Sequence, residues 1–359
     1  KRIVDRQITH QEQDTMTRRV IHTVAVLALL TLVGSVAYRL PPVQDFVMKR
    51  GALLVFGGSA ETFDGLQAVV CGSASPLGTN PDRAQACIAV VTPEHFFLVD
   101  VGARAPMRIN QAQLPLDRLN GVMFTHFHSD HIAGLADVNL GSWVGGRQES
   151  LNVYGPEGVA TVVEGFNTAY RLDRRYRIAH HGVELLPPAA GPMTAQTFEP
   201  GVVWQDDTMT VTSFLVDHKP IHPAVGYRFD YEGRSVVISG DTNASDNLFA
   251  AAQNADVVFH DALARQSLDI MRSSMAEVGR SRIAQIVSDV IDYHADSLTL
   301  EDAANAAGVR QLVLYHLVPT PVNGMTEDMF KRGLSGNTIL AHDLQTFSLP
   351  PNSDEIIIR

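Results

Sequence analysis

Cysteine is scarce in this chain, and its scarcity limits the fold classes to consider. Only two cysteines, Cys71 and Cys87, occur among 359 residues, too few for a disulfide-stapled scaffold or a cysteine-rich zinc module. Each lies in an apolar run typical of a strand, so we expect two small core residues, with a single bridge as the alternative. No repeat of fixed short period is present either, which argues against a solenoid.

Basic residues are also in the minority. Lysine and arginine number 28 against 39 acidic residues, a formal net charge of −11, and no stretch rich in lysine or arginine stands out. This balance argues against nucleic acid as an obligate partner, although a local basic groove is compatible with it. The hydrophobic share of 45% and the charged share of 19% are globular values, and the length predicts one large or two medium domains.

One long hydrophobic run, residues 20–38, carries no formal charge and is close to the ~20 residues that span a bilayer. We favour a retained membrane anchor, because the run is long and a polar segment, residues 1–19, precedes it. A signal peptide cleaved near residues 35–37 (Ser-Val-Ala) is the second interpretation, and a buried core helix is the third. Basic residues before the run predict that the following domain lies outside the cytoplasm, periplasmic or exported.

Beyond the hydrophobic run, residues 39–63 predict a linker, residues 64–350 a catalytic domain and residues 351–359 a tail. Short strands alternate with helices in two similar halves, separated by a proline-rich loop at residues 186–201. This alternation favours an α/β (α+β) domain with two packed sheets and helices outside. The predicted strands are 66–71, 87–91, 96–100, 151–154, 209–216, 225–231, 235–239, 257–259 and 311–315; the predicted helices are 116–120, 132–139, 159–171, 247–253, 275–291 and 299–307.

The strongest chemical signal is a cluster of histidines after the apolar residues 122–124. His126, His128, Asp130 and His131 place four ligand-type side chains in six positions, and they cannot all be buried without a cation or another polar partner. Imidazoles and carboxylates are ligands that zinc and similar ions accept. Because no thiolate is nearby, we expect an open hydrolytic site and not a closed structural one.

This His-x-His-x-Asp-His pattern resembles the signature of the metallo-β-lactamase superfamily, and three later motifs match as well. His218, Asp241 and His316 each follow an apolar run, so each should project from a strand end toward a common edge. The resemblance covers about residues 66–350. It implies a four-layer αββα sandwich.

The resemblance also implies a dinuclear metal site. One ion would take His126, His128 and His218, the other Asp130, His131 and His316, and Asp241 would be shared. A hydroxide bridging the two ions would be the nucleophile, with Asp130 available to orient it. Zinc is the expected metal, and manganese or iron would accept the same ligands.

Further motifs resemble ribonuclease Z and its arylsulfatase-like relatives within the superfamily. They are Asp217-His218, residues 223–228, residues 239–242 and Tyr154-Gly155-Pro156. His260 and His294 match two histidine loops of that branch, although Asp261 stands where the family has glutamate. By similarity, one of these histidines would protonate the leaving oxygen, and a purely structural role is the alternative for each.

The functional prediction depends on what lies between the motifs. Residues 229–234 predict a simple hairpin, whereas tRNA-processing members carry an arm that grips tRNA. With the acidic balance and the hydrophobic run, this favours hydrolysis of a small ester, phosphodiester or sulfate ester, with no nucleic-acid partner and a membrane contact through residues 20–38. The alternatives are tRNA 3′ processing, lactone or thioester hydrolysis, and a non-catalytic member; a homodimer is left open.

Three other basic positions have open roles in the sequence. Arg228 would face an anionic substrate or pair with an acid on the sheet. His222, four residues after His218, would line the pocket. The pair His180-His181 is predicted in a loop, in contact either with substrate or with solvent.

Overall fold

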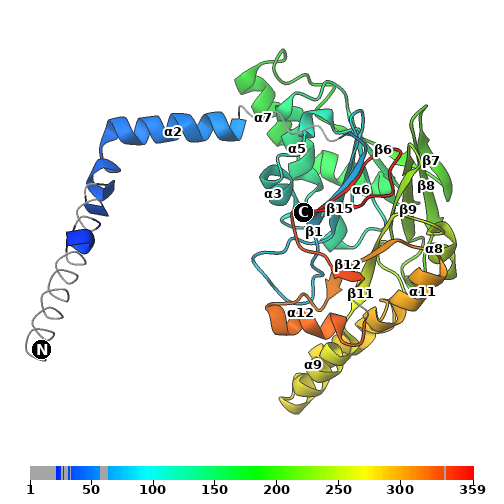
Figure 1. The fold of residues 1–359 in the computed structure, drawn as a ribbon. Coiled ribbons are helices and arrows are strands. Elements are labelled where there is room, and N and C mark those ends of the chain that lie inside the picture. Colours follow the sequence, from blue (N-terminus) through cyan, green and yellow to red (C-terminus); the bar gives the residue numbers. More distant parts are fainter. Residues whose placement is uncertain (1–21, 26, 28–30, 33, 57–63, 335–336) are drawn as a thin grey trace, which may run out of the picture. The chain divides into compact units, whose positions relative to one another are not determined.

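The structure, a computed structural model (Figure 1), describes residues 22–25, 27, 31–32, 34–56, 64–334 and 337–359. The chain divides into two units, one up to residue 61 and one from residue 62 onward. In the first unit, residues predicted to form a linker instead form helix α2 (Pro41–Phe56). Its two prolines lie in the first turn, where a missing N–H costs no helical hydrogen bond. The predicted polar segment, residues 1–19, lies outside the described residues.

The predicted membrane anchor is not supported. Among the helices that the structure describes, none is both long and apolar enough to cross a bilayer. Within residues 20–38, positions 20, 21, 26, 28–30 and 33 lie outside the described residues. The predicted membrane contact is corrected by this finding, and so is the location outside the cytoplasm, which was inferred from residues 20–38 as either an anchor or a signal peptide.

Two β-sheets form the centre of the second unit. The first sheet has eight strands and the second has seven. In spatial order, the first sheet contains β15 (Ile357–Ile358), β14 (Thr346–Leu349), β1 (Leu66–Gly72), β2 (Cys87–Val91), β3 (Phe96–Val99), β4 (Gly121–Met123), β5 (Leu151–Gly155) and β6 (Met193–Thr197). The second sheet contains β13 (Thr338–Leu340), β12 (Gln311–Val318), β11 (Val257–Leu263), β10 (Arg234–Ile238), β9 (Val225–Tyr231), β8 (Met209–Leu215) and β7 (Gly201–Gln205).

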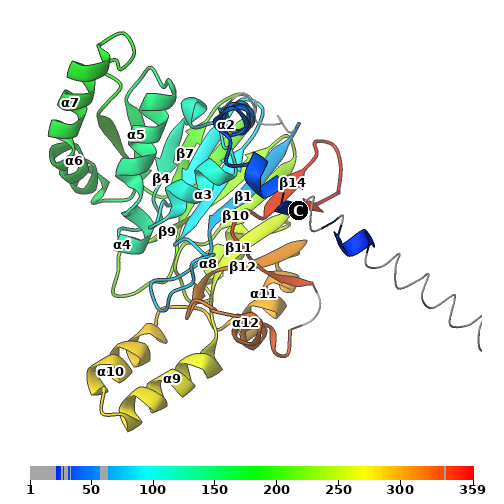
Figure 2. The same ribbon diagram turned by 90° about the vertical axis from the view of Figure 1, so that its left-hand side faces the viewer.

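Helices cover the outer faces of the two sheets (Figures 1 and 2). Those between β3 and β6 are α3 (Ala105–Gln111), the 3₁₀ turn η1 (Leu116–Arg118), α4 (Ser129–Ile132), α5 (Leu135–Gly145), α6 (Val159–Ala169) and α7 (Arg171–His181). The helices of the second half are α8 (Asp246–Ala251), α9 (Arg265–Glu277), α10 (Ser281–Val290), the 3₁₀ turn η2 (Ser297–Thr299), α11 (Leu300–Ala306) and α12 (Gly324–Lys331). Of these, α9 and α10 form a pair that extends away from the sheets (Figure 2).

Three apolar cores fill the interfaces between these layers. Phe97 and Phe229 belong to the core between the two sheets. Ile109 and Leu135 pack helices α3 and α5 against the first sheet, and Leu300 packs α11 against the second. Burial of these apolar faces stabilises the layers, and the arrangement confirms the predicted sandwich of two sheets with helices outside.

Parallel strands bring the candidate ligands to one place. Strands β3 to β6 run parallel in the first sheet, and β10 to β13 run parallel in the second. Two hydrogen bonds join the sheets there: Val225 N donates to Thr125 O at 3.0 Å, and the Tyr227 hydroxyl donates to Phe124 O at 2.6 Å. The carboxyl ends of parallel strands are where α/β folds usually place their sites.

The predicted helix 275–291 covers the end of one helix, α9, and the whole of a second, α10. Helix α9 ends at Glu277 and α10 begins at Ser281, with Gly279 between them at φ 74°. Arg280 N donates to Met275 O at 2.8 Å, which closes the first helix in the manner typical of a glycine C-terminus. The apolar spacing continues across this break, so the sequence pattern alone concealed it.

The strands β6, β7, β13, β14 and β15 were not predicted, and four of them, β6, β7, β13 and β15, lie at sheet edges. Strand β6 falls within the predicted loop at residues 186–201, and most of its side chains are exposed or half-buried. Strand β15 falls within the predicted tail and pairs with β14. An edge strand without an apolar face gives no alternating pattern, and for this reason neither segment was predicted as a strand.

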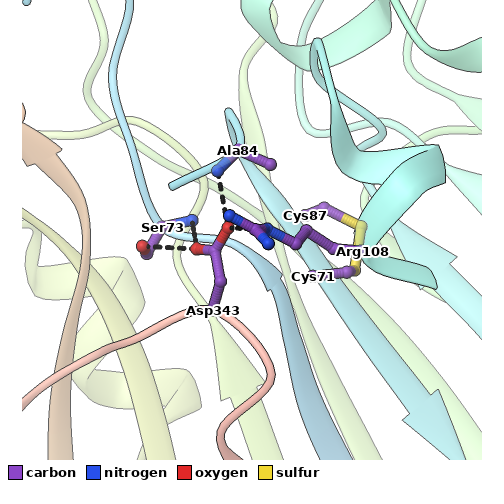
Figure 3. Close-up of a disulfide and its surroundings, with 6 residues drawn as sticks. All are labelled: Cys71, Ser73, Ala84, Cys87, Arg108 and Asp343. Carbon is purple, nitrogen blue, oxygen red and sulfur yellow. Dashed lines mark hydrogen bonds and ion pairs between the residues drawn. A yellow bond between two sulfur atoms is a disulfide. The ribbon is translucent and has the colours of Figure 1, made fainter. Parts of the chain in front are cut away.

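The prediction of two unlinked cysteines is wrong. Cys71 and Cys87 form a disulfide with their Cα atoms 4.9 Å apart (Figure 3). Val70 pairs with Ile88 and Gly72 with Cys87, so Cys71 is the additional residue of a bulge in β1. The bulge re-aims the side chain toward the neighbouring strand, and strand register cannot be read from an apolar run alone.

A buried carboxylate lies next to this disulfide. Asp343 accepts hydrogen bonds from the backbone N–H and hydroxyl of Ser73, from Ala84 N and from Arg108 Nε, at 2.6–3.1 Å (Figure 3). The charge of Arg108 balances that of Asp343. The group fastens the loop after β13 to the end of β1 and to α3.

Removing the disulfide should lower stability without changing the fold. The bridge closes a loop between residues 16 apart, for which restriction of the unfolded chain contributes about 3 kcal/mol. We expect Cys71→Ala/Cys87→Ala to lower the free energy of unfolding by about that amount in a urea titration. The wild-type protein with dithiothreitol in the denaturant is the control, and equal stability of the oxidised and double-alanine proteins would contradict the prediction.

Candidate metal centre

All seven predicted metal ligands converge where the two sheets meet. His126, His128, Asp130 and His131 follow β4 on the first sheet, and the last two lie in the single turn of α4. The other three come from the second sheet: His218 follows β8, Asp241 follows β10, and His316 lies near the end of β12. Both sheets are therefore needed to assemble the centre.

A first group of ligand atoms surrounds one point. His126 Nε2 lies 2.9 Å from His128 Nδ1, and His218 Nε2 lies 3.4 Å from the same Nδ1. Asp241 Oδ2 is 3.8 Å from His126 Nε2 and 3.9 Å from His218 Nε2. Four donors at this mutual distance can hold a metal ion, and the set of three imidazoles and one carboxylate suits zinc.

A second group shares Asp241 with the first. Asp130 Oδ2 lies 3.1 Å from His316 Nε2 and 3.5 Å from His131 Nε2. Asp241 Oδ2 lies 3.3 Å from His131 Nε2. These four residues can also hold a metal ion, so the geometry accommodates two centres with one carboxylate between them.

The backbone at two of these residues is specialised. His316 has φ 43°, a left-handed conformation that is uncommon for a residue with a side chain. Gly240 has φ 64°, and a Cβ there would lie 2.7 Å from the Cβ of Thr125. Only glycine fits this close approach, which lets Asp241 reach across to the first sheet.

Burial and charge prepare several of these side chains as metal ligands. Burial lowers the pKa of His126, His128 and His218, which favours the neutral imidazole that binds metal. Burial opposes ionisation of Asp130 and Asp241, but the surrounding histidines hold the pKa of both carboxyls below the usual range. These three histidines are thus held neutral beside the ionised carboxylates of Asp130 and Asp241.

Unpaired atoms provide an independent test of whether a cation fits. His131 Nε2, Asp241 Oδ1 and His316 Nδ1 are buried and have no hydrogen-bond partner among the described residues. His316 Nδ1 lies 3.1 Å from Asp241 Oδ1, but in an orientation that makes no hydrogen bond. Leaving such atoms buried and unpaired costs free energy, and bound cations would satisfy ligand atoms of this type.

Asp100, which the sequence analysis did not single out, orients His131 from behind. Its Oδ2 lies 2.8 Å from His131 Nδ1, and its carboxylate also accepts from the backbone N–H and hydroxyl of Thr125 at 2.9 Å. Burial would lower the pKa of His131, but Asp241, Asp100 and Asp130 raise it well above the usual value. A carboxylate behind a ligand histidine fixes its tautomer and leaves Nε2 for a metal.

A cavity of about 260 Å³ opens over the ligand groups. Its walls include Ser75, Pro76, Leu77, Val290, Tyr293, His294 and Val318, together with the ligand residues His128, Asp130, Asp241 and His316. The Tyr293 carbonyl lies 3.0 Å from His218 Nδ1, and its ring packs edge-on against the His218 ring. The cavity is thus polar at the candidate ligands and His294, and apolar at Pro76, Leu77, Val290 and Val318.

His294 and Asp261 form a pair at the wall of the cavity. His294 Nδ1 donates to Asp261 Oδ2 at 2.5 Å. Burial would lower the pKa of His294, but Asp261 and Asp241 raise it. Burial would raise the pKa of Asp261, but hydrogen bonds from His260 and His294 lower it. With Nδ1 bonded to a carboxylate, Nε2 is the nitrogen left to exchange a proton in the cavity.

His260 does not share this position. It lies inside β11 with no exposed surface, its ring stacks on Phe249, and it is not among the residues that line the cavity. Its Nδ1 donates to Asp261 O at 2.8 Å. The sequence placed His260 and His294 on an equal footing as proton donors, and the structure brings only His294 to the cavity.

The remaining basic candidates lie away from the cavity. Arg228 pairs with Asp230 at 2.9 Å and donates to the carbonyls of Ala251 and Gln253, so it holds the sheet to α8. His222 is exposed and does not line the cavity. The pair His180-His181, predicted in a loop, forms the exposed end of α7.

Comparison with known proteins identifies the family. The family model of the beta-lactamase superfamily domain matches residues 95–317. This span contains all seven predicted ligands. The chain belongs to the metallo-β-lactamase superfamily. The predicted resemblance is thereby confirmed, and the chain is a hydrolase of the metallo-β-lactamase fold.

Relatives within this superfamily carry a more specific name. A ribonuclease Z of Mycobacterium bovis (strain BCG / Pasteur 1173P2) is 33% identical over 292 residues, 80% of this chain and 99% of the relative. A ribonuclease Z of Mycolicibacterium gilvum (strain PYR-GCK) is 32% identical over 268 residues, 73% of this chain and 88% of the relative. The expectation that nucleic acid is an unlikely partner is overturned by these ribonuclease relatives.

Solved structures share the fold. The metallo-beta-lactamase fold protein YhfI from Bacillus subtilis has a TM-score of 0.57 at 19% identity, covering 79% of this chain and 99% of its own. The short form of human tRNase Z has a TM-score of 0.54 at 17% identity, with the same coverage. At these identities the likeness concerns the fold alone.

Proposed function

We propose that this metallo-β-lactamase-fold hydrolase is a ribonuclease of the ribonuclease Z type, which cleaves a phosphodiester bond in precursor tRNA during 3′ processing. The observation that carries the proposal is the ligand set with its adjacent His294–Asp261 pair, in a chain one third identical to mycobacterial ribonuclease Z over nearly the whole relative. The short β9–β10 hairpin does not argue against it, because that relative aligns over 99% of its length.

The proposed metal assignments follow the two ligand groups. His126, His128 and His218 would hold one divalent ion, Asp130, His131 and His316 the other, and Asp241 both; zinc is expected, and manganese or iron accepts the same donors. When bound, the ions would neutralise the phosphodiester charge and lower the pKa of water.

Two residues of the chain would orient the attacking water and protonate the leaving oxygen. The ionised carboxylate of Asp130 lines the cavity and would orient the attacking water by accepting a hydrogen bond from it. A phosphodiester oxygen must leave as an alcohol, which requires a proton at the moment the phosphorus–oxygen bond breaks. His294, held by Asp261 with a raised pKa, would donate that proton through Nε2.

A comparison of substrates tests the proposal. The purified, zinc-loaded protein should cleave a precursor tRNA with a 3′ extension, and a chelator should abolish the cleavage until zinc is restored. Matched RNA lacking the tRNA fold is the control for specificity. Hydrolysis of bis(4-nitrophenyl) phosphate without any RNA cleavage would reject the ribonuclease while keeping the hydrolase.

A further inference from the structure

Helix α7 is a basic element on an acidic protein. Its 11 residues include four arginines and a single acidic residue, Asp173; the arginines are Arg171, Arg174, Arg175 and Arg177. The whole chain, in contrast, carries a net charge of −11. RNA is a polyanion, so a protein of this net charge needs a local positive surface to bind it. Helix α7 provides such a surface.

The inward side of α7 attaches the helix to the fold. Ile178 packs with the cluster around Trp143, and Arg174 donates to Asn167 O at 2.8 Å at the end of α6. Arg177 pairs with Asp173 at 2.8 Å, one turn earlier. Arg174 therefore helps to hold the helix to α6, and Arg177 is occupied by an ion pair within α7.

The arginine side chains on the outward side of α7 have no partner among the described residues. Arg171 and Arg175 are four residues apart, so they lie on one face of the helix. Both are exposed, and neither has an ion-pair or hydrogen-bond partner among the described residues. Next to them Tyr176 is 67% exposed and Leu172 52% exposed. Guanidinium groups that no carboxylate occupies, beside an exposed aromatic ring, match the phosphate and base-stacking contacts of RNA-binding surfaces.

Helix α7 is connected to the candidate metal centre through α6. Gly158, which precedes α6, packs against Phe127 between His126 and His128, since a Cβ on Gly158 would lie 3.0 Å from the Phe127 ring. Helix α6 has 11 residues, a length of about 16 Å, and α7 begins where it ends. Figure 2 shows α6 and α7 on the same side of the unit as α4, which carries Asp130 and His131.

We propose that the outward face of α7, Arg171 and Arg175 with Tyr176, binds the phosphate backbone of the RNA whose scissile bond lies in the cavity. The inference rests on the proposed function and adds to it the surface that grips the RNA body. It does not depend on the base sequence, because guanidinium–phosphate contacts position a nucleic acid without reading it.

A charge reversal on α7 tests this surface. Arg171→Glu/Arg175→Glu is compared with wild type and with Lys331→Glu/Arg332→Glu, the same change in charge at exposed residues on and beside α12. Binding of mature tRNA is measured over a range of KCl concentrations, and precursor tRNA cleavage gives KM and kcat. Hydrolysis of bis(4-nitrophenyl) phosphate by all three proteins checks that the metal site of each is intact.

The α7 variant should bind tRNA about tenfold more weakly or worse, with the salt slope reduced by about 2 and the loss confined to KM. The α12 variant should bind as wild type. If wild type cleaves precursor tRNA but the α7 variant binds it as tightly, the inference is overturned and the ribonuclease stands. If wild type neither binds nor cleaves RNA, both fail. The inference would also be overturned if the α7 variant bound tRNA as tightly as wild type but no longer bound phosphatidylglycerol vesicles, because α7 would then be a lipid-binding helix.

Discussion

Asp241→Ala should abolish hydrolysis while leaving a folded protein. Asp241 Oδ2 lies between the two ligand groups, 3.3 Å from His131 Nε2 and 3.8 Å from His126 Nε2. Its removal takes away the one carboxylate that both groups share, but it deletes no part of the three apolar cores. We expect kcat on precursor tRNA to fall by about 10³-fold or more, because water would no longer be activated between two cations.

The measurement pairs kinetics with metal analysis. Elemental analysis after gel filtration should find less than the wild-type metal content, and circular dichroism should find the same secondary structure. Asp241→Asn is the matched control, since it keeps the shape of the side chain and removes its charge; it should lose activity to a similar degree. Full activity with two ions bound to Asp241→Ala would reject the shared-carboxylate centre.

His294→Ala should separate proton donation from metal binding. His294 lines the cavity and is held by Asp261 at 2.5 Å. It lies outside the two groups built on the seven predicted ligands, and with Asp241, Asp261 and His316 it forms a third group whose atoms are close enough to hold an ion. We expect cleavage of RNA to slow by about 10²–10⁴-fold, the usual contribution of a general acid. Hydrolysis of bis(4-nitrophenyl) phosphate should change little, because nitrophenolate leaves without a proton. Metal content should stay at the wild-type value.

The matched control is the buried histidine of β11. His260→Asn keeps a donor near the position of Nδ1, which bonds to Asp261 O, and it should not discriminate between the two substrates. Asp261→Asn should behave as a weaker form of His294→Ala, because it disturbs the orientation of the donor and not the donor itself. If His260→Asn lost activity on RNA selectively and His294→Ala did not, His260 would be the proton donor and His294 the structural histidine. A loss of metal from His294→Ala would instead make His294 a ligand.

The convergence of the candidate ligands was predictable from sequence, because four of the seven belong to one local motif. His126, His128, Asp130 and His131 occupy four of six positions after a strand, and Asp241 and His316 each end an apolar run, so their placement follows from strand direction alone. The family followed from the same residues, and the two-sheet sandwich followed from the alternation of strands and helices. Two pairs of residues that are distant in the sequence were not predicted. Asp100 contacts His131, 31 positions later, and Asp261 contacts His294, 33 positions later. Such pairs depend on register and loop path, which no short pattern encodes.

Two other errors have physical causes of their own. The apolar stretch at residues 20–38 satisfied a composition rule, yet no described helix there meets the length and polarity of a membrane span. The arginines of α7 were visible in the sequence, but the charge summed over the chain obscured a positive surface confined to 11 residues. Net charge describes a whole molecule, whereas RNA contacts a patch.

The pairing of β1 with β14 also determines when during synthesis the enzyme becomes competent. Gln67 on β1 bonds to Ser348 on β14 across 281 residues, and Asp343 fastens the same strand. A ribosome releases the amino-terminal part of a chain first, so the histidine cluster emerges long before His316 and the strand that borders β1. A nascent chain therefore carries the first four ligands without a finished centre until His316 and β14 have left the ribosome.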